Sequence, residues 1–194
     1  MLATLVNQLG VNGVWFACIL GASGGQPWIG TVSALVWIAW VLANHDHWPR
    51  ELGVVLFAGA IGLVADLVLI RFGGLHYVGL EPGALPGPHW IVALWMSFGT
   101  SLNVSFAWMH GRPLVAAILG AVFGPLAYVG GRKLGAVTFG PPDTEPLLWL
   151  AAVWGIAMPL LILVAARAHP EGPDVPGRTD PEPQRGSQSA GSGA

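Results

Sequence analysis

Residues 52–72 read LGVVLFAGAIGLVADLVLIRF, an apolar stretch that contains Asp66 and has Arg71 near its end. A helix needs about 20 mainly apolar residues to cross ~30 Å of hydrocarbon. This stretch meets that length, so it predicts a transmembrane helix. The predicted helix carries a carboxylic acid inside the membrane.

Five further stretches approach or meet the same length. Across the 194 residues, 54% are hydrophobic and 9% are charged, and the mean hydropathy is +0.63. A soluble domain has roughly 25% charged residues. We therefore predict an all-α fold, a polytopic integral membrane bundle of about six transmembrane helices. The expected spans are residues 2–20, 28–43, 52–72, 89–108, 113–130 and 146–166.

The chain divides into a transmembrane helical domain, residues 1–167, and a polar tail, residues 168–194. The tail is rich in Pro, Gly, Ser, Gln and charge and has no apolar period, so we expect it to be disordered. Residues 73–88 and 131–145 are the long connections, rich in Gly and Pro. Both fall on the same side of a six-helix series, and we expect them to fold over the mouth of the bundle.

Charge and cysteine content exclude several classes. A net charge of −2 provides no basic field, so no nucleic-acid partner is expected. The single cysteine, Cys18, permits neither an intrachain disulfide nor a Cys-based metal knuckle. No Lys or Arg precedes the first apolar run, so the first helix is expected to stay in the mature protein.

Orientation is predicted from the Lys and Arg residues near the helix ends. A cytoplasmic N-terminus places Arg50, Arg112 and Arg167 inside. Arg71 and the Arg132–Lys133 pair then lie outside. With further Arg residues on the tail, the balance favours N-in and C-in, in the bacterial cytoplasmic (inner) membrane.

An ionisable group in hydrocarbon costs ~2.5 kcal/mol or more, so it normally faces the bundle interior and a partner. Asp66 follows Ala58 and Gly62 at four-residue spacing, which puts the acid on a stripe of small residues. Counting along antiparallel spans places other polar groups at related depths. We predict a polar track across the bundle with Asp66 at its mouth; its residues are Asp66, Trp95, Asn103, Tyr128, Asn12 and Gln8.

The sequence allows two interpretations of the role of Asp66. A protonated Asp can serve only as hydrogen-bonding glue between helices. Alternatively, it relays a proton or recognises a polar headgroup at that depth. Arg71, about one turn away, would then offset its charge.

Two polar groups near the membrane faces are weaker candidates. One combines His45, Asp46, His47 and Arg50 with His110 and Arg112, a possible headgroup or metal face. The His spacing fits no strong metal signature and solvated loop histidines are commoner, so no metal or other cofactor is predicted. The other pairs Arg132 and Lys133 after two glycines, a possible anion site for which an ordinary charged helix end is the favoured reading.

Several short motifs resemble a bacterial inner-membrane family, number 2878 in the domain-of-unknown-function series. They are WFACILGA at residues 15–22, Trp95, LNVSFAW at 102–108, GRP at 111–113 and GPLAY at 124–128. The likeness covers roughly residues 1–167. No activity is agreed for this family. The resemblance implies a role linked to the modification of membrane fatty acyl chains, with lipid-modifying enzymes as partners.

Three functions stay open. The first is an accessory membrane protein that helps to handle or modify lipid acyl chains. The second is a small transporter that moves a proton or polar solute along the track, which usually requires internal symmetry that the sequence does not show. The third is a membrane enzyme that uses the face of His45, Asp46, His47 and His110, the one place where acid, base or metal groups converge.

Overall fold

The computed structural model describes residues 1–80 and 88–168. Within them the chain forms six α-helices, two three-residue strands and one short 3₁₀ helix, η1. The predicted tail falls almost wholly outside the described residues, as does part of the connection at 73–88. The elements are α1 (Leu2–Ser23), α2 (Trp28–Ala43), α3 (Trp48–Arg71), β1 (Leu75–Tyr77), α4 (His89–Gly99), η1 (Ala107–Met109), α5 (Pro113–Lys133), β2 (Val137–Phe139) and α6 (Thr144–Ala168).

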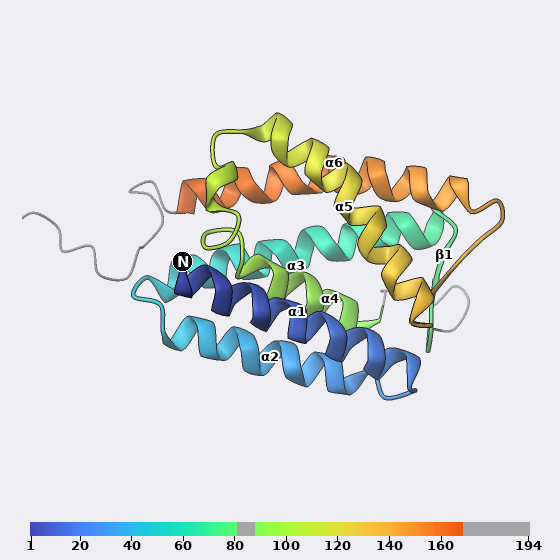
Figure 1. Cartoon of the computed structure of the whole chain (residues 1–194), viewed down its shortest axis with the longest axis horizontal. Helices are drawn as coiled ribbons and strands as arrows, with labels where there is room; N and C mark the ends of the chain where they lie inside the picture. Colours follow the sequence, from blue (N-terminus) through green and yellow to red (C-terminus); the bar gives the residue numbers. More distant parts are fainter. Residues whose placement is uncertain (81–87, 169–194) are drawn as a thin grey trace, which may run out of the picture.

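The helices form an elongated bundle in which α4 occupies the middle (Figure 1). It contacts α1, α2 and α3, while α3 also contacts α6, and α5 packs on α6. The N-terminus and the end of α6 lie at one end of the bundle, which we call the terminal end (Figure 1). The strands lie at the other, which we call the ribbon end.

Four helices, α1, α3, α5 and α6, are long and apolar enough to cross a membrane, so the chain is an integral membrane protein. The helix α2 is apolar but has 16 residues. The helix α4 has 11. The six-span count therefore stays a prediction.

The predicted continuous helix over residues 89–108 is wrong in its second half, because α4 ends at Gly99. Three hydroxyls near this end bond back to the helix, from Ser97 to Leu94 O, Thr100 to Ser97 O and Ser101 to Phe98 O. Such bonds give the backbone an alternative to further helix. The backbone N–H groups of Val104, Ser105 and Phe106 then all donate to the carbonyl of Ser101.

The two long connections do meet at the ribbon end, and they do so through an antiparallel two-stranded ribbon. Leu75 faces Phe139, and Tyr77 faces Val137. Gly74, at φ +64°, makes the turn into β1, and its carbonyl accepts the N–H of Gly140. The second connection is shorter than expected, since α5 continues to Lys133.

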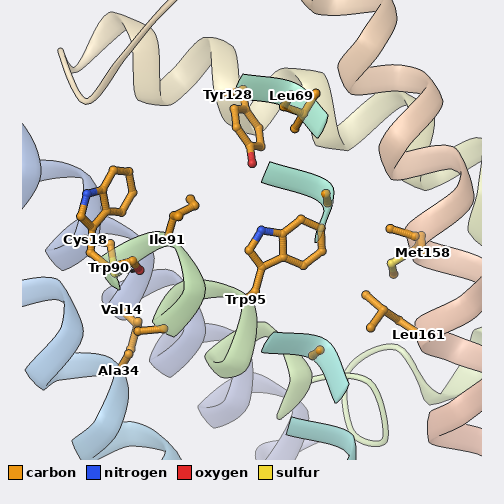
Figure 2. Close-up of a cluster of buried hydrophobic side chains, with 14 of the residues drawn as sticks. Val14, Cys18, Ala34, Leu69, Trp90, Ile91, Trp95, Tyr128, Met158 and Leu161 are labelled. Atoms are coloured by element: carbon orange, nitrogen blue, oxygen red, sulfur yellow. Dashed lines mark hydrogen bonds between the residues drawn. The ribbon is translucent and has the colours of Figure 1, made fainter. Parts of the chain in front are cut away.

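Small residues let the helices approach closely, as their spacing predicts. A Cβ atom on Gly62 of α3 would overlap the indole of Trp95, and one on Gly124 of α5 would overlap that of Trp154. Both indoles are thus seated directly on a helix backbone. Trp95 belongs to a cluster of buried side chains that spans several helices (Figure 2).

Candidate functional site

Asp66 is fully buried and lies at the centre of a hydrogen-bonded group of four side chains. Its Oδ1 accepts the hydroxyls of Tyr77 at 2.5 Å and Tyr128 at 2.9 Å. Its Oδ2 accepts the indole N–H of Trp95 at 3.0 Å. We call these four residues the Asp66 cluster. The two tyrosine hydroxyl oxygens are themselves 3.2 Å apart.

Each member of the Asp66 cluster comes from a different element: α3, β1, α4 or α5. Figure 2 shows the Tyr128 hydroxyl and the Trp95 indole nitrogen directed toward the stretch of α3 between them. The structure thus brings together Asp66, Trp95 and Tyr128, which the sequence placed at one end of the polar track. Tyr77 arrives on the ribbon, so the cluster also ties the ribbon to the bundle.

The hydroxyl and indole groups that donate to Asp66 are neutral. Arg71 is exposed, with its guanidinium 5.9 Å from the centre of the Phe72 ring, so the expected offset of the Asp66 charge is not what the structure shows. Burial raises the pKa of Tyr77 well above its ordinary value, and the nearby Asp66 raises it further. The Tyr77 hydroxyl therefore remains a proton donor at neutral pH.

The Trp95 ring is held in place from its other side. It stacks on Trp154 of α6, with ring centroids 4.2 Å apart and planes 14° apart. Stacking and the Asp66 bond leave the Trp95 ring little freedom to turn. The indole nitrogen of Trp154 is itself buried.

Asn103 belongs to a second polar group, at the terminal end. Its Nδ2 donates to Glu51 Oε2 at 2.9 Å. Nearby, Asn7 of α1 donates to the Thr100 carbonyl at 3.1 Å and accepts the Ser105 hydroxyl at 2.8 Å. We call Asn7, Glu51, Thr100, Asn103 and Ser105 the Asn103 cluster. All five are buried.

The predicted polar track is therefore divided into two clusters. The side-chain hydrogen bonds of Asp66 reach Tyr77, Tyr128 and Trp95, whereas that of Asn103 reaches Glu51. Gln8 is half-buried and Asn12 is exposed, and the Asn12 amide bonds locally to the Gln8 carbonyl at 2.7 Å. The buried amide of α1 is Asn7, one residue away from the position that the prediction used.

The histidine face is partly exposed. His45 is half-buried, and its Nδ1 accepts the N–H of His47 at 3.2 Å, which makes a local turn. His110 bonds through Nε2 to the Leu102 carbonyl at 3.2 Å. Asp46, Arg50 and Arg112 are exposed. In the described part of the chain, no three His, Cys, Asp or Glu residues are arranged to hold a metal ion.

At the ribbon end, Arg132 pairs with Asp143 at 2.7 Å and lies over the Phe139 ring, 4.9 Å from its centre. Both partners of the ion pair are exposed. Lys133 is exposed beside them. The guanidinium already has an anionic partner from its own chain, which supports the reading of a charged helix end.

Two hollows lie between α1 and α2. One has a volume of about 350 Å³ and the other about 490 Å³, and Ala17 lines both. We call them together the α1–α2 groove. The lining is mostly Gly, Ala and larger apolar side chains: Gly10, Gly13, Val14, Ala17, Leu20, Gly21, Gly24, Gln26, Ile29, Ser33, Val36, Trp37 and Trp40.

Sequence reasoning missed Tyr77 and Glu51. Tyr77 lies in a connection and reaches Asp66 only because β1 pairs with β2, some 60 residues away along the chain. Glu51 lies one residue before the expected span at 52–72, so the sequence prediction places it in a connection. The Trp48-Pro49 pair, with Pro in the first turn of α3, is the signal that places Glu51 on the helix instead.

No curated protein and no solved structure matches the chain. A family model described as "Protein of unknown function (DUF2878)" matches residues 4–160, from α1 into α6. The resemblance drawn from the sequence motifs is confirmed. With most of its length matched, the chain belongs to this family of unknown function.

Proposed function

We propose that the protein is an accessory protein of the bacterial inner membrane that holds lipid acyl chains for modification by partner enzymes. The α1–α2 groove carries the proposal. Hollows of a few hundred Å³ with mostly apolar linings are typical of small-molecule sites. The occupant of an apolar groove on membrane helices is an acyl chain.

Glycine and alanine shape the groove. A Cβ atom on Gly13 would meet nothing within 4 Å, so the α1 backbone is uncovered there. Trp37 and Trp40 of α2 stack, with centroids 5.1 Å apart, and form the opposite wall. Because hydrocarbon surrounds both free and bound acyl chains, selectivity in such a groove comes from van der Waals fit. Residues that change the groove's shape are therefore the ones to test.

The polar clusters have a supporting role in this proposal. Asp66 has donors on both carboxyl oxygens and is fully buried, so it offers no open surface to a substrate. It joins four elements and thereby fixes the bundle that carries the groove. The N-in, C-in orientation belongs to the same proposal and follows from the Lys and Arg balance.

Filling the groove tests the proposal. Gly13→Leu adds a side chain to the groove, and its Cβ atom would meet no protein atom within 4 Å. The matched control is Gly53→Leu on α3, where an added Cβ also meets nothing within 4 Å but which does not line the groove. The measurement uses purified protein in vesicles that contain a phospholipid with a diazirine on its acyl chain. We expect Gly13→Leu to reduce photolabelling of α1 and α2 roughly threefold or more. A tenfold reduction would correspond to a loss of about 1.4 kcal/mol in binding free energy.

The cellular test compares acyl-chain composition in membranes of wild-type and deletion cells. We expect deletion to shift the composition, Gly53→Leu to restore it and Gly13→Leu to fail. Equal labelling of both variants, together with an unchanged acyl composition after deletion, contradicts the proposal.

A second function has one observation in its favour. The Tyr77, Tyr128 and Asp66 oxygens form a continuous hydrogen-bonded group in the bundle, the kind of chain along which protons move. A proton transporter would require Asp66 to exchange a proton with both sides of the membrane. Replacement of Asp66 separates this function from a structural role.

A further inference from the structure

The outward face of α1 carries a polar side chain near the middle of the membrane. Asn12 is exposed, and the rise of a helix places it roughly 15 Å from either end of α1. The hydrocarbon core is ~30 Å thick, so Asn12 lies close to its centre. Water and lipid carbonyls lie outside that core. A polar group at this depth therefore normally has a protein partner.

Asn12 differs from the polar residues of the other membrane-length helices. In α3, α5 and α6, which the structure describes throughout, every exposed polar side chain lies in the first or last turn. The polar side chains farther inside these helices, such as Asp66 and Tyr128, are buried. An exposed amide in the middle of α1 is thus an exception, and it points to a contact outside the single chain.

The Asn12 amide has unused hydrogen-bonding capacity. A carboxamide offers two N–H donors and an acceptor oxygen. One N–H of Nδ2 donates to the Gln8 carbonyl at 2.7 Å. Among the described residues, the other N–H and the oxygen Oδ1 have no partner. Because an unpaired polar group in hydrocarbon is costly, a partner helix that supplies both a donor and an acceptor would stabilise this arrangement.

A second copy of the chain supplies both. All copies insert into the membrane with the same orientation, so a two-fold axis that relates two copies runs along the membrane normal. Such an axis brings each residue to the depth of its own counterpart. Each Asn12 can then donate its free N–H to the Oδ1 atom of the other copy. The carboxamide is its own complement, and two hydrogen bonds form across the axis.

The surface around Asn12 is apolar and uncovered. Leu5, Leu9 and Phe16 lie on the same face of α1 and are 57%, 66% and 51% exposed. Within the bundle, α1 packs mainly on α2 and α4, which leaves this face open. Phe16 is held edge to face against Trp15, with ring centroids 4.9 Å apart. These side chains provide van der Waals packing beside the amide pair.

We propose that the face of α1 formed by Leu5, Leu9, Asn12 and Phe16 is the interface between two copies of this chain, with reciprocal Asn12 hydrogen bonds at its centre. The α1–α2 groove lies on another side of α1, since Ala17 is about 140° around the helix from Asn12. The proposed interface holds whether or not the groove binds lipid.

Energy transfer between donor-labelled and acceptor-labelled copies tests the interface. The purified full chain is measured in vesicles over a series of protein-to-lipid ratios. We expect Asn12→Leu to weaken association roughly tenfold, because it removes both hydrogen bonds of the pair. Asn12→Gln keeps the carboxamide and should retain most of the association.

Asn44→Leu is the matched control. Asn44 is also exposed, and its amide makes the same local bond, to the Trp40 carbonyl at 2.8 Å, but it follows the end of α2. We expect this variant to associate as the wild type does. Equal association of Asn12→Leu and the wild type, or a wild-type chain that is monomeric at every ratio, overturns the proposal.

Cross-linking keeps the test decisive where an Asn12 variant fails to fold. Phe16→Cys places a thiol on the proposed interface, whereas Val122→Cys places one on the exposed face of α5. The native Cys18 is buried. With copper phenanthroline as oxidant in membranes, we expect an interchain disulfide in Phe16→Cys and none in Val122→Cys. Equal cross-linking at both positions, or none at Phe16→Cys, overturns the interface.

Discussion

The Asp66 cluster and the Asn103 cluster each surround a buried carboxylic acid, but they differ in how their hydrogen bonds are satisfied. Both Asp66 oxygens accept a donor, and the four members come from four regular elements. The Asn103 cluster surrounds irregular backbone after α4, and Asn103 Oδ1 is without a partner. The satisfied cluster lies at the ribbon end and the incomplete one at the terminal end.

This difference separates two uses of polar groups in a membrane bundle. A closed network whose members pack on glycine stabilises one arrangement of helices. A network that keeps a buried acceptor unpaired pays a cost that ligand binding can offset. The Asp66 cluster therefore has the features of an architectural element, whereas the Asn103 cluster leaves the oxygen of Asn103 without a hydrogen-bond donor.

The largest effect is expected where the Asp66 cluster rests on backbone. In Gly62→Leu, the added Cβ would overlap the base of the Trp95 indole, which Asp66 and Trp154 hold in place. Overpacking typically costs about 1–3 kcal/mol, and more where neither the backbone nor the ring can shift. We expect loss of the folded protein, measured as recovery of monodisperse protein in detergent.

Gly53→Leu controls for the effect of leucine on the same helix, since Gly53 has open space beside it. It should fold normally. If Gly62→Leu folded equally well, Trp95 would have another position available, and the Asp66 cluster would not be architectural.

The parts of these clusters that the sequence predicts depend on local periodicity. The spacing of Ala58, Gly62 and Asp66 puts the acid on an inward stripe, and depth counting then places Trp95 and Tyr128 near it. The end of α4 cannot be predicted from hydropathy, because residues 102–108 remain mostly apolar. Hydropathy also does not show which hydroxyl groups compete for helix carbonyls.

The sequence-based prediction misses Tyr77 and Glu51 for different physical reasons. The position of Tyr77 follows from pairing of β1 with β2, a long-range contact that no window of sequence contains. Glu51 follows charged and His-rich residues. The Trp48-Pro49 pair indicates that it is helical, but only its contact with Asn103 in the fold shows that its side chain is buried. Neighbours brought by the fold, and not the residue types alone, separate these two from ordinary loop residues.

A smaller effect is expected from Asp66→Asn. The amide has one oxygen and one N–H₂ group, so one of the three donors now facing the carboxyl group loses its acceptor. An unsatisfied buried donor costs about 1–3 kcal/mol. We expect the variant to fold with a lowered melting temperature and to label with photoactivatable lipid as the wild type does.

The Asp66→Asn variant also distinguishes a structural role of Asp66 from a role in proton transport. Proton flux into vesicles is the measurement, with the wild type and Arg132→Ala as references. Unchanged stability together with a lost proton flux in Asp66→Asn would show that the carboxylic acid relays protons, and the Asp66 cluster would then belong with the functional sites.

The smallest effect is expected from Arg132→Ala. Arg132 bonds Asp143 at 2.7 Å and lies over Phe139, but both members of the ion pair are exposed, and solvent screens them. Exposed pairs contribute ~0–1 kcal/mol, so the melting temperature should fall by about 4 °C or less. If Arg132→Ala instead lowered the melting temperature as much as Asp66→Asn does, the ion pair would hold the ribbon in place. This is because β2 contains Phe139 and pairs with β1, the strand that contains Tyr77. In that case the Asp66 cluster would depend on a surface contact at the ribbon end, and its stability would fall with added salt, which a buried network of neutral donors does not predict.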